Sequence, residues 1–254
     1  TQIALAEESN IGRVNDPAGG AWFVESMTQQ LGAKAWEVFQ GLDAEGFVAK
    51  LADGTVAAQL AEVTAARAKG LSTRRIPLTG VSMFPNYTET LPTRQARPEA
   101  PAYGGLTLRR DSQVFEDLRD RSDAARAAGN GPKVLLACLG ARRDFGGREG
   151  FTSNLYHVGG IETINAEGAT PEDFARRLTE AGAKVAVLCS SAKVYADQGI
   201  AVAEALRAAG AEQVLVAGQI AELGEGGEAA VDGNVFDGMN VVDLLTTTLE
   251  KLGA

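Results

Sequence analysis

Histidine and cysteine are scarce in this chain, and their scarcity excludes several kinds of site. The 254 residues contain one histidine, His157, and two cysteines, Cys138 and Cys189. No Cys-x-x-Cys pair or Cys/His spacing typical of zinc ligands occurs, so no zinc site is expected. Both cysteines lie in apolar runs, LLACLG and VAVLCSS, which favour buried, reduced thiols and a reducing compartment, most simply the cytoplasm.

Long hydrophobic runs and an excess of positive charge are also absent. Charged residues interrupt every apolar run, whereas a membrane-spanning helix needs about 20 apolar residues. No basic segment followed by an apolar one opens the sequence, so no signal peptide is expected. Residues 131–254 hold 17 acidic and 10 basic side chains, which disfavours nucleic acid and anionic membranes as partners.

Residues 1–75 are expected to be helical without strands of their own. Apolar residues recur at helical spacing between Trp22 and Phe39 and again between Val56 and Ala68. The sequence opens in a helical pattern at Thr1, which favours a chain that starts inside a larger protein. Helices with apolar stripes and no strand between them must pack against something else.

Residues 76–130 have a different character, because five of the eight prolines lie between Pro77 and Pro101. We expect one short strand at Ile76–Phe84, then an extended linker, and one helix after Asp111. Three aromatic residues are candidates to anchor the linker: Phe84, Tyr87 and Tyr103.

Residues 131–254 alternate between short apolar runs and amphipathic stretches, which predicts a parallel sheet with helices on both faces. The expected strands are Val134–Leu139, Glu162–Asn165, Val185–Cys189, Val214–Ala217 and a weak one near Val235. The expected helices cover about 150–157, 172–182, 197–209 and 241–252. Five strands in this length fit an α/β domain of the flavodoxin-like class.

The first strand runs into a glycine-rich stretch, Arg142–Gly147, before the first helix of this domain. Doubly wound sheets usually hold their ligand at this βα turn. The arginines Arg142, Arg143 and Arg148 near a helix N-terminus raise the alternative of a phosphate site. Because the P-loop lysine and serine are missing, local ion pairs are the preferred interpretation. His157 is expected to be structural, and Gly224–Glu228 to be a flexible loop.

The segment GRVNDPAGGAWFVESMTQQLGAKAW (Gly12–Trp36), with its Arg-Val-x-Asp-Pro-x-Gly-Gly core, resembles the methylmalonyl-CoA mutase family. The resemblance covers nearly the whole chain. It implies that residues 1–75 are the C-terminal helical part of a (β/α)8 TIM barrel and that residues 76–130 are a linker with one helix. Residues 131–254 would then be a cobalamin-binding-type domain with a five-stranded parallel sheet.

The resemblance also implies that this cobalamin-type domain is degenerate. Cobalt-binding members carry Asp-x-His-x-x-Gly after the first strand, and this chain has Asp144 at the histidine position. They carry Ser-Ser-Leu after the third strand and Gly-Gly after the fourth, where this chain has Ser-Ser-Ala and Gly-Gln. The vestigial cofactor positions are Asp144, Gly147, Ser190, Ser191, Gly218 and Gln219. No cofactor, metal or catalytic residue is expected here.

The pattern of losses narrows the resemblance to the non-catalytic small subunits of the family's bacterial heterodimers. It implies a catalytic large subunit as partner, with adenosylcobalamin bound there, in a complex that interconverts succinyl-CoA and (R)-methylmalonyl-CoA. Two alternatives stay open. The chain is itself a working mutase that binds cobalamin without a histidine ligand, or it is a regulatory domain that binds another nucleotide.

Overall fold

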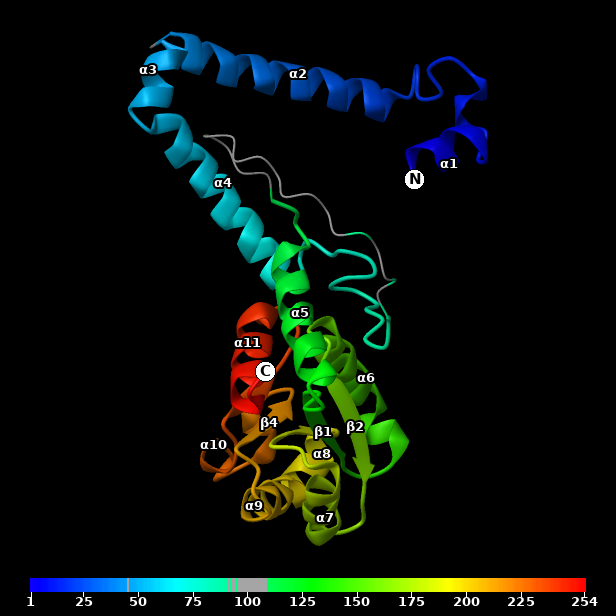
Figure 1. Cartoon of the computed structure of the whole chain (residues 1–254), viewed down its shortest axis with the longest axis vertical. Helices are drawn as coiled ribbons and strands as arrows, with labels where there is room; N and C mark the ends of the chain where they lie inside the picture. The colour runs from blue at the N-terminus through cyan, green and yellow to red at the C-terminus, as the bar shows by residue number, and fades with distance from the viewer. Residues whose placement is uncertain (45, 91, 93–94, 96–108) are drawn as a thin grey trace. The chain divides into compact units, whose positions relative to one another are not determined.

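The computed structural model describes residues 1–254 except 45, 91, 93–94 and 96–108 (Figure 1). Contacts within the chain divide it into two units, Thr1–Thr64 and Ala65–Ala254. The division falls inside helix α4 (Thr55–Ser72). Among the described residues, no helix has both the length and the apolar character needed to cross a membrane.

The first unit is helical, as its apolar spacing predicts. It contains α1 (Gln2–Glu7), the short 3-10 helix η1 (Ile11–Arg13), α2 (Trp22–Asp43), α3 (Phe47–Ala52) and the start of α4. None of the residues of α1, α2 or α3 is buried. Trp22 is 82% exposed and Leu31 is 70% exposed. These helices therefore have an apolar stripe but no core of their own.

The second unit is built on a five-stranded parallel sheet, which confirms the predicted α/β class. The strand order is β2-β1-β3-β4-β5. The strands are β1 (Lys133–Cys138), β2 (Glu162–Glu167), β3 (Val185–Cys189), β4 (Gln213–Ala217) and β5 (Gly233–Val235). Strand order and all-parallel pairing are those of a flavodoxin-like domain.

Helices cover both faces of this sheet (Figure 1). Alternate side chains of β1 point to opposite faces, so Leu136 packs with α5, α6 and α11 whereas Leu135 packs with α7 and α9. These helices are α5 (Gln113–Ala127), α6 (Arg142–Val158), α7 (Pro171–Ala181), α9 (Ile200–Ala208) and α11 (Val241–Leu252). Between β3 and α9 the chain forms α8 (Ala192–Val194) and a π-helical turn, η2 (Tyr195–Gly199).

Helix α6 begins eight residues earlier than the glycine-rich pattern predicts, so Arg142–Gly147 is helix and not turn. The chain already turns at Gly140, whose φ is +81°. Asp144 then accepts a hydrogen bond from the backbone N–H of Ala141 at 3.0 Å and caps the helix. Phe145 is buried against the sheet, and this packing offsets the low helix propensity of the glycines.

Two other predictions for irregular segments are wrong. Ile76–Phe84 does not form a strand, because the N–H groups of Val81, Ser82 and Met83 all donate to the carbonyl of Leu78 and fold the segment into a turn. Ile76, Leu78 and Val81 pack against the core. The predicted loop Gly224–Glu228 is wrong in its last two residues, which begin a short helix, α10 (Gly227–Ala230).

The candidate anchors of the linker differ among themselves. The ring of Tyr87 stacks on that of His157 with centroids 4.0 Å apart, which confirms one anchor. Phe84 is 76% exposed, so it anchors nothing in this unit. Tyr103 lies outside the described residues.

Candidate functional site

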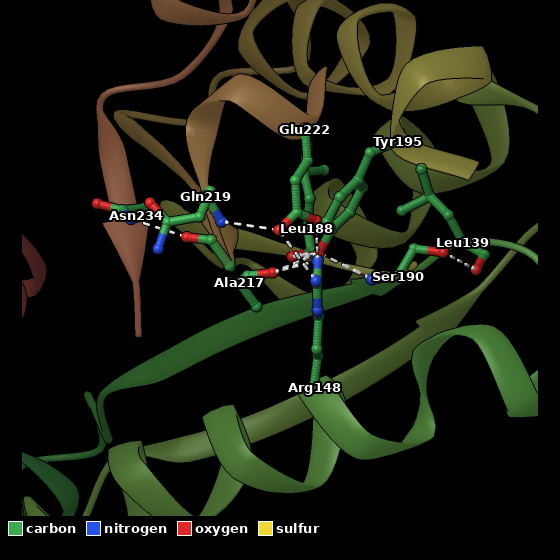
Figure 2. A network of polar contacts seen from close by, with 10 residues as sticks. Leu139, Arg148, Leu188, Ser190, Tyr195, Ala217, Gln219, Glu222 and Asn234 are labelled. Carbon is green, nitrogen blue, oxygen red and sulfur yellow. Dashed lines mark hydrogen bonds and ion pairs between the residues drawn. The ribbon is translucent and has the colours of Figure 1, made fainter. Parts of the chain in front are cut away.

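The strand order places the candidate site at the carboxyl ends of β1, β3 and β4. The order reverses between β1 and β3, and open α/β sheets bind ligands in the crevice outside that point. The residues after β1, β3 and β4 are those that the sequence singled out. Figure 2 shows that carbonyls at these strand ends and side chains from the segments that follow the strands converge on one polar network.

Asp144 is placed near the crevice but is used for helix capping. Its carboxylate lies at the third position of α6 and accepts the N–H of Ala141 at 3.0 Å. Gly147 lies in the second turn of α6, and a Cβ added there would meet no atom within 4 Å. The Asp144 carboxylate is therefore already bonded within the chain, and the lack of a side chain at Gly147 is not required by any close neighbour. The described residues contain no group of three or more metal-ligating side chains.

Ser190 closes the point where the strand order reverses. It is fully buried, and its hydroxyl donates to the carbonyl of Leu139, the residue after β1, at 2.8 Å. Ser191 is partly exposed and caps α8 without a side-chain hydrogen bond. The two adjacent serines thus have different roles, and only Ser190 ties β1 to β3.

Tyr195 fills the interior beside this bond. It is fully buried, and its hydroxyl accepts the N–H of Ser190 at 2.8 Å. The same hydroxyl lies 2.8 Å from the carbonyl of Leu188 and 2.9 Å from that of Ala217, and it has one proton to donate to either of them. The ends of β3 and β4 are therefore joined through one phenol. Burial raises the pKa of Tyr195, so this phenol stays protonated.

Arg148 reaches from α6 to the end of β4. Its guanidinium donates to Glu222 on the 3-10 helix η3 (Ile220–Leu223), at 2.6 and 3.1 Å, and to the carbonyl of Ala217 at 2.9 Å. Arg148 therefore forms an ion pair, as expected of the arginine cluster, but with a partner distant in the sequence. Gln219 is exposed, and its N–H donates to Glu222 at 3.3 Å.

Sequence reasoning identified Ser190 and Gly218 as crevice positions but missed two of the groups that fill the crevice, Tyr195 and Glu222. Glu222 is 74 residues from Arg148 along the chain. A partner at that separation leaves no periodic signal. Tyr195, five residues beyond Ser190, was the one available clue, because a tyrosine after a strand end is often buried with its hydroxyl bonded.

The remaining reactive side chains lie outside this network. His157, at the far end of α6, has its Nε2 3.0 Å from the Thr163 hydroxyl, and burial followed by the charge of Arg119 lowers its pKa. Burial, reinforced by Glu149 and Glu167, raises the pKa of Cys138 to about 12. A buried thiol with this pKa is not a nucleophile at neutral pH.

Comparisons with known proteins place the chain in a family. The family described as methylmalonyl-CoA mutase matches residues 1–128, half of the chain. The chain belongs to the methylmalonyl-CoA mutase family. It is 48% identical to a methylmalonyl-CoA mutase small subunit of Propionibacterium freudenreichii subsp. shermanii and 43% identical to one of Streptomyces virginiae. A probable small subunit of Mycobacterium bovis is 39% identical. Each alignment covers the whole chain but 40% of the relative's length.

Two of the positions that the family resemblance assigns to cobalamin are engaged by contacts within this chain. The position that resembles the cobalt ligand holds Asp144, whose carboxylate caps α6. The backbone of Gly218 lies directly against Arg148, because a Cβ added to Gly218 would lie 2.7 Å from Nη1. The space beside this glycine is therefore taken by a side chain of the same protein.

Proposed function

We propose that this chain is part of the non-catalytic small subunit of a heterodimeric methylmalonyl-CoA mutase. The large subunit would bind adenosylcobalamin and interconvert succinyl-CoA and (R)-methylmalonyl-CoA, and this chain would stabilise it. The observation that carries the proposal is the polar network that fills the crevice: Ser190 bonds to the carbonyl after β1 and to Tyr195, and Arg148 bonds to the carbonyl that ends β4. The names of the aligned relatives support the assignment to a small subunit.

The structural role rests on the exposed apolar side chains of the first unit. Trp22 is 82% exposed, Phe23 61% and Trp36 60%. Burying one large apolar side chain stabilises an assembly by about 1.5–3 kcal/mol. We propose that the remaining barrel of the same subunit, together with the large subunit, covers these helices. Stability conferred on a complex in this way requires no chemistry from this chain.

Equilibrium titration tests the absence of a cofactor site. The chain is titrated with adenosylcobalamin while its absorbance spectrum is followed, and no saturable change is expected up to millimolar cofactor. Micromolar binding would favour the alternative of a mutase without a histidine ligand. The Asp144→His variant sharpens the experiment, because it restores the ligand type but leaves Arg148 and Tyr195 in place. It is expected to bind no better than the unaltered chain.

The stabilising role is tested with the large subunit. The proposal predicts that the large subunit unfolds at a lower temperature alone than when purified with the small subunit. Equal unfolding temperatures would contradict a structural role, but they would not bear on the absence of a cofactor site in this chain.

A further inference from the structure

The guanidinium of Arg148 is surrounded by a carboxylate, a backbone carbonyl and an aromatic ring. One face of the fork makes two hydrogen bonds to the carboxylate of Glu222, and Nη1 makes a third to the carbonyl of Ala217 (Figure 2). The carbon Cζ lies 5.2 Å from the centre of the Tyr195 ring. A bidentate carboxylate, a carbonyl and an aromatic face are the partners that a guanidinium prefers over an ammonium ion.

The backbone beside this group has a shape that only glycine provides. Gly218 has a φ of +124°, and a Cβ there would lie 2.7 Å from Nη1 and 2.9 Å from Cζ. The loop is fixed by other bonds, because Asn234 donates to the Gly218 carbonyl at 2.7 Å and the Gly218 N–H donates to Val235 at 2.9 Å. The backbone at Gly218 is therefore held in place by bonds that do not involve Arg148.

The site is charged and reachable from solvent. The side chain of Glu222 is 20% exposed and that of Arg148 is 32% exposed. Burial alone would lower the pKa of Arg148, but the neighbouring Glu222 carboxylate and Tyr195 outweigh it and raise that pKa. The neighbouring groups thus stabilise the charged form of Arg148 although its side chain is partly desolvated. A binding site for a cation has the same requirement.

We propose that the carboxyl end of β4 is a guanidinium-binding site occupied by Arg148 of the same chain, and that this internal ligand ties α6 to β4 and η3 across the crevice. The acceptors come from β4 and η3, whereas the ligand comes from α6. The site therefore joins parts of the chain about 70 residues apart. The inference does not depend on the proposed role in a mutase complex, since it concerns a site within one chain.

Chemical rescue tests the proposal directly. Arg148→Ala removes the atoms that ethylguanidinium would replace, and it is expected to lower the unfolding temperature of the full chain by several degrees. Millimolar ethylguanidinium is then expected to raise that temperature along a saturating curve, because a ligand that binds the folded state stabilises it. An alkylammonium ion of similar size is expected to give little rescue.

Two further variants define the specificity of the rescue. Arg143→Ala removes an exposed arginine of the same helix and is expected to show no rescue. Glu222→Gln in the Arg148→Ala background removes the bidentate carboxylate and is expected to abolish it. Equal stabilisation by ethylguanidinium in all three variants, or none in Arg148→Ala, would overturn the proposal.

A double-mutant cycle with Gly218→Ala keeps the proposal testable if rescue is hard to measure. The added methyl group strains the backbone and collides with the guanidinium, so the single variant is expected to lose more stability than Arg148→Ala. In the Arg148→Ala background the collision is gone and only the backbone strain remains, so the loss is expected to be smaller. Strict additivity of the two losses would contradict the close packing of Arg148 on Gly218.

Discussion

The two units of the chain bury their apolar residues very differently. In the first unit, α2 carries two tryptophans and two phenylalanines and has no buried residue. In the second unit, every residue of β3 is buried and β1 is buried from Val134 onward. Both regions are rich in apolar residues, so apolar content alone does not tell whether a face finds its partner within the chain. We infer that the second unit has its own core whereas the first depends on other parts of an assembly.

The largest contrast is expected from aromatic truncations in the two units. Phe174 is 1% exposed in the second unit, and Phe174→Ala is expected to cost about 3–5 kcal/mol of unfolding free energy. Trp22 is the exposed aromatic residue for comparison in the first unit, at 82% exposure. Trp22→Ala is expected to change the unfolding free energy by less than about 0.5 kcal/mol. Denaturant unfolding of the full chain measures both.

The order of the two effects is expected to be reversed when association with the large subunit is measured. Trp22→Ala is expected to weaken association with the large subunit, whereas Phe174→Ala acts mainly through folding. A large loss of chain stability from Trp22→Ala would contradict the absence of a core in the first unit.

A smaller effect is expected from the hydroxyl that ties β1 to β3. Ser190→Ala leaves the buried carbonyl of Leu139 without its partner at 2.8 Å, which costs about 1–3 kcal/mol. Ser191→Ala is the matched control, because this hydroxyl makes no capping hydrogen bond, and it is expected to be nearly neutral. Urea unfolding of the two variants side by side distinguishes the serines. Equal losses would show that burial of Ser190 does not matter.

A comparable or smaller loss is expected at the start of α6. Asp144→Ala removes the acceptor for the N–H of Ala141, and loss of one such hydrogen bond costs about 0.5–1.5 kcal/mol. Asp144→Asn keeps an acceptor oxygen and is expected to lose less. Thermal unfolding ranks the two variants. A stability gain in Asp144→Ala would show that the carboxylate is held in place for some other purpose than capping.

The smallest effect concerns pH in the second unit. Burial and then Arg119 lower the pKa of His157 below its ordinary 6.5, so the unfolded chain binds this proton more readily than the folded one. Stability is therefore expected to be unaffected by His157 above the ordinary pKa and to fall as pH drops from there toward the lowered value. The His157→Gln variant lacks this loss, and unfolding between about pH 7.5 and about pH 5.5 compares the two. Identical slopes would contradict the shift.

The sequence predicts the sheet well and the crevice poorly, for a physical reason. Strand β3 was placed with its observed bounds because a fully buried parallel strand is a continuous apolar run. The start of α6 was missed because its glycines have low helix propensity, and only the cap at Asp144 and packing on the sheet offset this. The pair formed by Arg148 and Glu222 depends on tertiary contact, which local pattern does not contain.

The number of cobalamins in the intact complex tests the central claim most directly. The small subunit is purified together with the large subunit, the complex is saturated with adenosylcobalamin and freed of excess, and bound cofactor is counted by absorbance against protein. Because the crevice of this chain is filled by its own side chains, one cobalamin per heterodimer is expected. Two per heterodimer would show that the crevice filled by Arg148 and Tyr195 opens to a cofactor, and would contradict the account.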